Sequence, residues 1–405
     1  MEKIKILIIN SVLPFPATTG GDQAVINMIN GLQYKCEVHF LFQIQAGADL
    51  NMAKKNWSKV TLHSFTKTRT IPFYLSRMAI HYVHRFQQNN KKYDYLINPS
   101  LYYVNDFITF IGHTIDLIKP DIVQTEFYPN LELVYVLPNS IKKVFVQHEI
   151  HYTINEQRRN NDSKWGSMQS LSLNKLKAEE ITAMNQYDVV FTLTQADCDK
   201  LQTDGVSTQI LASPVGIEKP KIRNACSFKN KLVFVGAGTH SPNIEGIMWF
   251  LNNVWHYIIE KHSEINLYIV GKWNKEQIKQ LLQFNNVSFK GFVPSLQDEY
   301  DGAIVIVPIL RGSGLRMKIL DAVNYGSPFI ATTIGAFDMK FLDNRDCYIA
   351  DEPVEFANKL LELIEHADIR ERFYNNSAKI VEKYYSIDHL TDKRFKYYLS
   401  LLNQR

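Results

Sequence analysis

Short runs of β-branched and other apolar residues alternate with amphipathic stretches along the whole chain, and no other feature restricts the fold as strongly. Such runs, bounded by turns, are typical of strands that are buried on both faces of a parallel sheet. The amphipathic stretches predict helices that connect parallel strands by right-handed crossovers. The fold class is therefore α/β. The predicted strands cover residues 4–9, 38–42, 60–62, 95–97, 122–124, 144–146, 189–193 and 209–211, and then 232–235, 267–270, 287–289, 304–307, 329–331 and 348–349.

The helices predicted between these strands also form two sets. A chain of 405 residues exceeds one ordinary core. Residues 214–221 contain two prolines and a glycine, which interrupt any periodicity. We therefore expect a first domain at 1–215 and a second at 216–385, with a last helix, at about 386–405, that packs back on the first domain. The predicted helices cover 22–32, 103–118 and 173–185 in the first domain and 244–261, 276–282, 315–324 and 354–366 in the second.

The composition is that of a folded globular protein. Hydrophobic residues make up 45% of the chain and charged residues 21%, which argues against extended disorder. The formal net charge is +4, and the basic residues are spread along the chain rather than gathered in the stripe that a dedicated nucleic-acid binder shows. We expect no nucleic-acid partner, and the small surplus of positive charge suits a pocket for phosphate groups.

The cysteines and the apolar segments indicate where the protein works. Cys36, Cys198, Cys226 and Cys347 lie far apart, which argues against structural zinc and fits a reducing compartment. The apolar run at 6–9 is too short for a signal peptide, and no window approaches the roughly 18 apolar residues of a membrane span. We expect a cytoplasmic protein whose membrane contact, if any, is peripheral.

A predicted strand runs into Gly312-Ser313-Gly314, and a helix follows. Glycines let backbone amides approach a ligand closely, and a helix N-terminus offers free N–H groups to an anion. Arg316 and Lys318 then fall in the first turn of the predicted helix, where a cation opposes the helix dipole. A bound anion would offset that cost, and a diphosphate is the natural candidate.

Asp321 lies three residues after Lys318, on the same face of the predicted helix. A carboxylate one turn behind a phosphate site can accept hydrogen bonds from two vicinal hydroxyls, such as those of a ribose. The alternative is an ordinary surface ion pair between Lys318 and Asp321. The neighbouring glycines and Arg316 favour the ligand site.

This segment resembles the donor-binding segment of the GT-B glycosyltransferases, in particular family 4, which includes many bacterial polysaccharide-assembly enzymes. That family commonly shows two glutamates separated by seven residues, an Ala-rich helix and Gly-x-Pro. Asp321 stands at the second acidic position, followed by Ala322, Gly326 and Pro328, whereas the first acidic position falls on Ser313. The resemblance implies two Rossmann-like domains that face a central cleft.

The resemblance also implies roles for residues of the second domain. Arg316 and Lys318 would hold the donor diphosphate, with the amides of Gly312, Ser313 and Gly314, and Asp321 would hold the ribose. The loops that end neighbouring predicted strands would cradle the donor; considered alone, they could be ordinary strand-end turns. These loops contribute the further candidates Gly236, Gly271, Phe292 and Val293.

In the first domain, Gly20 and Gly21 stand at the start of a predicted helix, another position that suits an anion. The loop is not G-x-G-x-x-G, so a nicotinamide-binding fold is not indicated. In the resembled family this loop approaches the donor phosphate and the acceptor. The alternative is a simple flexible turn.

His148 and Glu149 stand at the carboxyl end of another predicted strand. The run His-Glu-x-His is one residue short of the zinc-protease motif and is not on a helix, so we reject a metalloprotease. In the resembled family, a histidine at such a strand end touches the donor sugar, and Glu149 would orient the acceptor or support the loop. Glu126 ends the preceding strand and is a weaker candidate. A structural histidine is the alternative.

Two further features receive separate interpretations. Asp197-Cys-Asp199 matches a D-x-D metal motif, but it follows Thr194 at a predicted helix start, where acidic residues stabilise the dipole, so we expect no metal. Residues 73–92 combine an apolar stripe with flanking basic residues, which suits either an anionic membrane surface or, more commonly, the protein core.

The resemblance implies a retaining hexosyltransferase that moves a sugar from a nucleotide-sugar donor to a glycan, lipid-linked or protein-linked acceptor, without a cofactor or metal. Two alternatives stay open: a non-catalytic GT-B-like subunit that activates a partner transferase, and a sugar-nucleotide epimerase.

Overall fold

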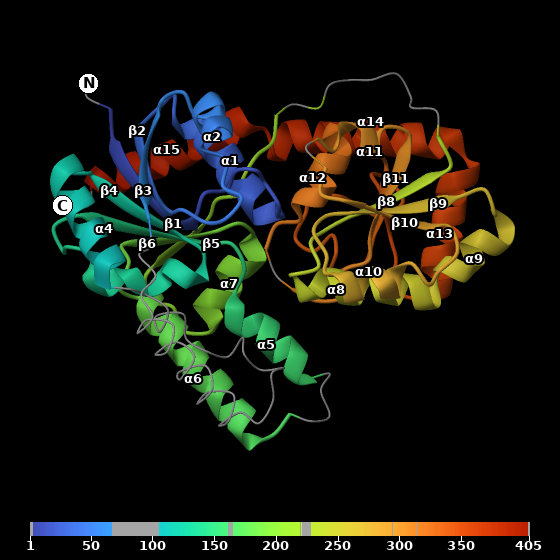
Figure 1. The fold of residues 1–405 in the computed structure, drawn as a ribbon, viewed down its shortest axis with the longest axis horizontal. Coiled ribbons are helices and arrows are strands. Elements are labelled where there is room, and N and C mark those ends of the chain that lie inside the picture. Colours follow the sequence, from blue (N-terminus) through green and yellow to red (C-terminus); the bar gives the residue numbers. More distant parts are fainter. Residues whose placement is uncertain are drawn as a thin grey trace. The chain divides into compact units, whose positions relative to one another are not determined.

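The computed structural model describes residues 3–66, 105–160, 165–218, 220, 228–293, 295–312 and 314–403 (Figure 1). The expected strand at 95–97, the apolar stretch at 73–92, Cys226 and Ser313 lie outside the described residues. The chain divides into two compact units. Unit 1 comprises Met1–Phe15, Ile29–Ser213 and Arg394–Arg405, and unit 2 comprises Pro16–Met28 and Pro214–Lys393.

Unit 1 is built on a parallel sheet in the order β3-β2-β1-β4-β5-β6-β7. The residues of β4 and β6 are buried throughout, as expected for strands covered on both faces. Each of these strands was predicted from its apolar run, and the structure confirms them all. Their bounds are β1 Lys5–Val12, β2 Glu37–Gln43, β3 Val60–Phe65, β4 Ile122–Glu126, β5 Lys142–Gln147, β6 Val189–Thr192 and β7 Gln209–Ala212.

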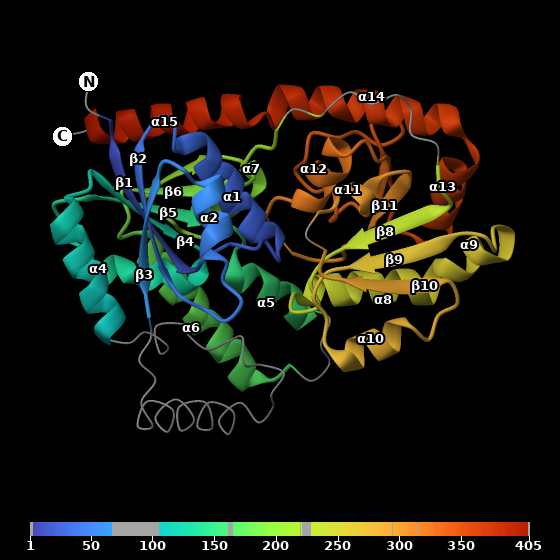
Figure 2. The same cartoon turned by 45° about the horizontal axis from the view of Figure 1, so that its top comes forward.

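The helices of unit 1 pack apolar faces on this sheet. Phe107, Ile111 and Ile115 of α4 are buried against residues of β1, β2 and β4. Two helices, α5 and α6, lie side by side and extend away from the sheet (Figures 1 and 2). The helical elements between β1 and β7 are α1 Gly20–Leu32, whose residues up to Met28 belong to unit 2, and α2 Leu50–Asn56, α4 Asn105–Ile118, the 3₁₀ segment η3 Tyr128–Val136, α5 His151–Asn160, α6 Ser167–Met184 and α7 Gln195–Thr203.

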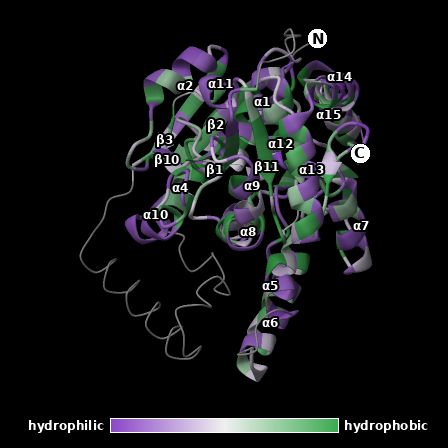
Figure 3. Cartoon of the chain, turned by 90° about the vertical axis from the view of Figure 1, so that its right-hand side faces the viewer, coloured by the Kyte–Doolittle hydropathy of each residue, from purple (hydrophilic) through white to green (hydrophobic). Residues whose placement is uncertain are grey.

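Unit 2 has a parallel sheet in the order β10-β9-β8-β11-β12-β13. Numbered within the unit, this order is 3-2-1-4-5-6, that of the Rossmann fold, and the first six strands of the unit 1 sheet follow it too. Hydrophobic residues run along β11 at its centre (Figure 3). The bounds are β8 Lys231–Val235, β9 Asn266–Val270, β10 Val287–Gly291, β11 Ala303–Val307, β12 Phe329–Ala331 and β13 Tyr348–Ile349, all as predicted to within two residues.

One predicted helix of unit 2 is wrong in its continuity. The stretch 244–261 forms two helices, and Val254, with φ −118° and ψ −41°, is the residue that ends the first and precedes the second. Trp255 after it is buried, and its indole N–H donates to the carbonyl of Asn285 at 2.9 Å. The helices are α8 Ser241–Asn253, α9 Trp255–Lys261, α10 Lys275–Leu281, α11 Gln297–Tyr300, α12 Met317–Asn324, α13 Pro353–Glu365, α14 Ala367–Tyr384 and α15 Ile387–Asn403.

The end of the chain forms α14 and α15, which are separated by a short break. At this break Ile217 N–H donates to the carbonyl of Tyr385 at 2.8 Å, and Ile387 N–H donates to the carbonyl of Ile217 at 3.0 Å. A Cβ on Gly216 would lie 2.7 Å from the Cα of Ile387, so the chain needs glycine at this position. The residues of α15 from Arg394 onward belong to unit 1.

Candidate functional site

The glycine-rich start of α12 lies in unit 2, directly after β11. Gly312 and Gly314 have φ values of +113° and +82°, which side chains other than glycine rarely adopt. Arg316 has non-helical backbone angles, φ −89° and ψ 83°, and stands at the cap position, so the prediction that Arg316 falls within the first turn is wrong. The turn at Gly314 precedes the helix, which therefore begins only at Met317. Lys318 does lie in the first turn.

The ammonium group of Lys318 contacts the first turn of α8 and a ring of β8. Its Nζ donates to Asn243 Oδ1 at 2.7 Å and lies 4.7 Å from the centroid of the Phe234 ring. Burial, and secondarily the charge of Arg316, lower the pKa of Lys318 to about 7. Lys318 therefore bonds to Asn243 and does not form the surface ion pair with Asp321 that we considered as an alternative.

The Asp321 carboxyl group is held in a low-polarity environment. Burial raises the pKa of Asp321 to about 7, and within the part of the chain that the structure describes its carboxyl group has no hydrogen bond or ion pair. Burial, and secondarily the charge of Asp321, raise the pKa of the fully buried Tyr300. Lys318 and Asp321 thus lie one helical turn apart, and burial disfavours the charged form of each. Groups with perturbed pKa values of this kind cluster at functional sites.

The glycines that end β8 and β9 are explained by backbone packing. Gly271 has φ +139°, and a Cβ on it would lie 2.2 Å from the carbonyl oxygen of Gly236. That same oxygen accepts a hydrogen bond from the indole N–H of Trp273 at 2.8 Å. A Cβ on Gly236 would lie 2.7 Å from the side chain of Asn243. The close approach accounts for both glycines, and their part in binding a donor stays a prediction.

The end of β10 presents an aromatic ring. Phe292 is 38% exposed, and the ammonium group of Lys272 lies 5.2 Å from the centroid of its ring. Val293 is partly buried and packs against Val233 and Val270 at the sheet. An exposed ring at the carboxyl end of a strand is available for stacking on a flat ligand.

The helix start at Gly20 is fixed by side-chain caps. The Asp22 carboxylate accepts from the backbone N–H groups of Thr18 and Thr19, both at 2.9 Å, and Asp22 N–H donates to the Thr19 hydroxyl at 3.1 Å. This reciprocal pattern is a capping box that begins the helix at Gly20. Within unit 2, a Cβ on Gly20 would lie 3.4 Å from the Cβ of Met317 at the start of α12. Gly21 is the next residue of the helix.

In unit 1, His148 follows β5 and pairs with Glu126, the last residue of β4. The His148 Nε2 atom and the Glu126 Oε2 atom are 2.6 Å apart, and the two side chains are 8% and 0% exposed. The ring of Phe127 stacks on the imidazole with 3.8 Å between centroids. The structure thus brings Glu126, the weaker candidate in the sequence, against His148.

Glu149 is partly buried between His148 and the start of α5. Glu180 of α6 anchors that helix start, because its carboxylate accepts from the backbone N–H groups of His151 at 3.3 Å and Tyr152 at 3.1 Å, and from Gln147 Nε2 at 2.8 Å. Burial raises the pKa of Glu180 to about 7. The carboxylate complements the N-terminal dipole of α5 and so fixes the loop that carries His148 and Glu149.

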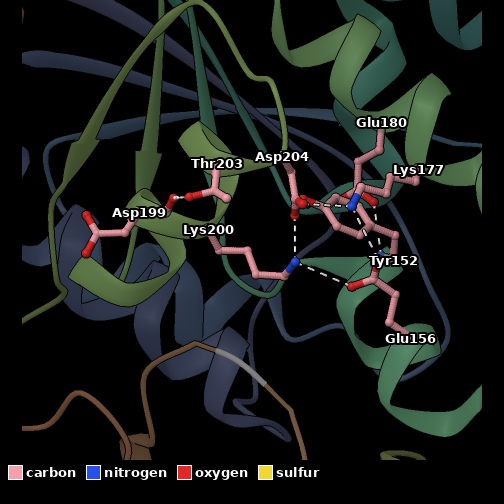
Figure 4. A network of polar contacts seen from close by, with 8 residues as sticks. All are labelled: Tyr152, Glu156, Lys177, Glu180, Asp199, Lys200, Thr203 and Asp204. Atoms are coloured by element: carbon pink, nitrogen blue, oxygen red, sulfur yellow. Dashed lines mark hydrogen bonds and ion pairs between the residues drawn. The ribbon is translucent and has the colours of Figure 1, made fainter. Parts of the chain in front are cut away.

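A network of ion pairs holds α5 further along (Figure 4). Asp204, which ends α7, accepts from Tyr152 at 2.7 Å, from Lys177 at 2.7 Å and from Lys200 at 2.6 Å. Lys177 and Lys200 also reach Glu156, at 3.3 and 3.4 Å. Three helices are tied together behind the His148 loop, which supports a structural role for this cluster.

The D-x-D sequence at the start of α7 has structural roles. The Thr194 hydroxyl accepts from the backbone N–H of Asp197 at 3.1 Å as a helix cap. Asp199 accepts from Gln195 at 2.8 Å on the same helix. Among the described residues, no cluster of three His, Cys, Asp or Glu side chains could hold a metal ion. None of the helices described in the structure is long and apolar enough to cross a membrane.

Several residues that contact Lys318 or His148 were not predicted from the sequence. Asn243 is 75 positions from Lys318, and Phe234 lies within a strand that reads only as core. Phe127 has φ +65° and ψ 152°, a backbone conformation that no residue-type pattern predicts for a phenylalanine. The Asn at 243 does follow a glycine-rich strand end, which is the one signal that could have indicated it.

The sheet order of both units and the superposition on solved structures show that the chain has the GT-B fold. Sucrose-phosphate synthase from Thermosynechococcus elongatus superposes with a TM-score of 0.73 at 13% identity, over 100% of each chain. TarM of S. aureus, in complex with UDP and alpha-GlcNAc-glycerol, superposes with a TM-score of 0.70 at 12% identity, over 100% of each chain. The pneumococcal O-GlcNAc transferase GtfA, in complex with UDP and GlcNAc, gives 0.67 at 11%, again over 100% of each chain.

The sequence comparisons concern parts of the chain. Residues 229–366, which include α12 and the loops that end β8 to β10, match the model of the family described as glycosyl transferases group 1. The chain therefore has the GT-B fold, and residues 229–366 of unit 2 are similar to the glycosyl transferases group 1 family. An uncharacterized 44.6 kDa protein from the cps region of Klebsiella pneumoniae is 26% identical over 211 residues. The match covers 49% of this chain and 53% of that relative, about half the length of each.

Proposed function

We propose that the chain transfers a hexosyl group from a nucleoside-diphosphate sugar to a glycan, lipid-linked or protein-linked acceptor, with retention of the anomeric configuration and without a metal. The observation that carries the proposal is the start of α12, which lies inside the segment matched by the family model. Gly312 and Gly314 supply the turn there, and Lys318 and Asp321 supply an amine and a carboxyl group whose pKa values are both about 7. UDP is the first donor nucleotide to test, because it is bound in the structures of TarM and GtfA.

The chemistry follows from the charge of the leaving group. As the bond between the sugar and the diphosphate breaks, negative charge builds on the phosphate oxygens. Lys318 and Arg316 would stabilise that charge, as preorganised groups do in a site of low polarity. A dianionic ligand would restore the proton on Lys318, whose pKa of about 7 leaves it partly neutral in the free chain. Asp321 would accept the ribose hydroxyls, and His148 would bind the sugar.

The test is a transfer assay with UDP-, GDP-, ADP- and dTDP-linked hexoses, offered with bacterial lipid-linked glycan and soluble oligosaccharide acceptors in the presence of EDTA. We expect release of one nucleoside diphosphate together with a glycosylated product whose anomeric configuration, determined by NMR, matches the donor. Replacing Lys318 by Met should remove this activity.

Each other outcome decides against the proposal. Conversion of the donor sugar to its epimer without any acceptor would identify an epimerase. A chain that consumes no donor alone but raises the rate of another transferase would be a non-catalytic subunit. Loss of activity in EDTA, restored by Mg²⁺ or Mn²⁺, would contradict the metal-free mechanism.

A further inference from the structure

A chain of buried hydrogen bonds leads from the last helix to His148, entirely within unit 1. The Tyr398 hydroxyl, on α15, lies 2.5 Å from Gln124 Oε1, although the two residues are 274 positions apart. Gln124 Nε2 lies 2.5 Å from Glu126 Oε1, and Glu126 Oε2 lies 2.6 Å from His148 Nε2. Tyr398, Gln124 and Glu126 are fully buried, so water does not compete for these bonds.

The chemistry of the groups fixes the direction of each bond. The Glu126 carboxyl oxygens accept, one from Gln124 Nε2 and the other from His148 Nε2. The NH₂ end of Gln124 must therefore face Glu126, which turns the Gln124 carbonyl oxygen toward Tyr398. Burial raises the pKa of Tyr398, so its hydroxyl keeps the proton that it donates to Gln124. In this series of hydrogen bonds, each donor of one side chain therefore faces an acceptor of the next.

The same reasoning sets the tautomer of His148. Its Nε2 must carry the proton that it donates to the Glu126 carboxylate. Its Nδ1 atom is buried and, among the residues that the structure describes, has no hydrogen-bond partner. A buried N–H without an acceptor is more costly than a lone pair without a donor, so Nδ1 carries the lone pair. With its proton on Nε2, the ring has one unused hydrogen-bonding position, the lone pair of Nδ1, which is an acceptor.

The orientation of the ring is also held. Phe127 stacks on it with an angle of 16° between the ring planes. Phe127 adopts φ +65° with ψ 152°, a conformation that costs about 1–3 kcal/mol in a non-glycine residue and persists only where the surroundings enforce it. Strain of this kind is concentrated at functional sites, and here it places a ring flat against the imidazole.

We propose that Glu126, supported by Gln124 and Tyr398, is a positioning residue that holds His148 as its Nε2–H tautomer, so that Nδ1 accepts a hydrogen bond from a hydroxyl of the bound sugar or acceptor. The identity of that hydroxyl as a substrate group rests on the proposed function. Because Nδ1 is buried in this structure, the hydroxyl reaches it only after neighbouring side chains move. The last helix thereby contributes to the site through Tyr398.

The tautomer is measured by ¹⁵N NMR of the full chain labelled at histidine, with the His148 signals assigned by their loss in His148→Phe. We expect an Nε2–H and an unprotonated Nδ1 in the wild type. In Glu126→Gln we expect both tautomers, because an amide can donate or accept. This readout needs no activity, so it can fail or succeed independently of the proposed function. An Nδ1–H tautomer in the wild type would overturn the inference.

The kinetic arm uses Tyr398→Phe, which removes one hydroxyl and keeps the ring. We expect kcat for sugar transfer to fall about tenfold or more in Glu126→Gln and several-fold in Tyr398→Phe, with the donor KM nearly unchanged, since misplacing a catalytic group affects the reaction rather than binding. Tyr187→Phe is the matched control. Its hydroxyl is also buried and donates to the carbonyl of Leu131 at 2.6 Å, outside this chain of bonds. Equal losses of kcat in Tyr187→Phe and Tyr398→Phe would show that only general stability had changed.

Discussion

Replacing Lys318 by Met should stabilise the ligand-free chain and abolish nucleotide binding. In the folded chain burial, and secondarily Arg316, lower the pKa of Lys318 from 10.5 to about 7, a displacement that corresponds to at most about 5 kcal/mol of cost to the charged form. Lys318 keeps partial exposure, and Met loses the hydrogen bond to Asn243, worth about 1 kcal/mol. We therefore expect a net gain of about 1–3 kcal/mol at pH 7, or about 2–4 °C in Tm for each kcal/mol.

The dependence on pH gives the prediction its sign. Because the folded pKa lies below the unfolded value, the unfolded chain binds more protons between about pH 7 and pH 10. The penalty is present in full below pH 7 and disappears as the pH rises through this window. The gain in Lys318→Met should therefore shrink between pH 7 and pH 10. Differential scanning fluorimetry at pH 6, 7, 8 and 9.5, with and without UDP, measures both effects.

The matched control is Lys379→Met, which removes an exposed lysine of α14 in the same unit. It should change Tm by little at any pH and leave the stabilisation by UDP intact. A loss of stability in Lys318→Met at pH 7, or a difference that does not change with pH, would refute the reasoning that the ammonium group is penalised by burial. Stabilisation of Lys318→Met by UDP equal to that of the wild type would refute its role in binding.

Three further perturbations test other parts of the account. In Asp321→Asn the gain in unfolding free energy over the wild type should grow from pH 4 to pH 7 and then level off. The reason is that the raised pKa of Asp321, about 7, makes the folded wild type bind more protons than the unfolded chain in that window. Chemical denaturation at each pH measures this gain, and a gain that is the same at every pH would contradict the burial argument. Gly271→Ala should lower Tm and cost more than about 2 kcal/mol, since its Cβ would meet the Gly236 carbonyl at a φ of +139°, and an unchanged Tm would show that the strand ends can separate. Arg394→Met should cost about 2–4 kcal/mol in urea denaturation, because the buried guanidinium donates to the hydroxyl and the carbonyl of Ser213, both at 2.7 Å, and a neutral result would place the anchoring of α15 elsewhere.

The central strands of both sheets were predictable because they are buried on both faces and form continuous apolar runs. β11, Ala303–Val307, is an example: every one of its residues is buried. The break at Val254 was missed because the apolar periodicity continues through it, although Asn253, Val254 and Trp255 are weaker helix formers than Ala or Leu. Periodicity alone does not locate such a break, after which Trp255 is buried.

The candidate site was predictable only where it is local in sequence. The residues Gly312, Gly314, Lys318 and Asp321 lie within ten positions and were found together. Pairings between distant segments, such as Lys318 with Asn243 or Tyr398 with Gln124, depend on how the chain folds back, and no spacing rule links them. The pKa values of Lys318 and Asp321 likewise arise from burial, which a sequence pattern does not measure.

The most direct test of the central claim is calorimetric titration of the wild-type chain with UDP, and with GDP, ADP and dTDP in parallel, at pH 8 in two buffers of different ionisation enthalpy and in the presence of EDTA. The account predicts that one nucleoside diphosphate binds and that binding takes up close to one proton, because Lys318, mostly neutral at pH 8 in the free chain, becomes charged against the diphosphate. Binding without proton uptake would contradict the role of Lys318. If none of the four nucleoside diphosphates binds, the proposed nucleotide-sugar transfer is contradicted.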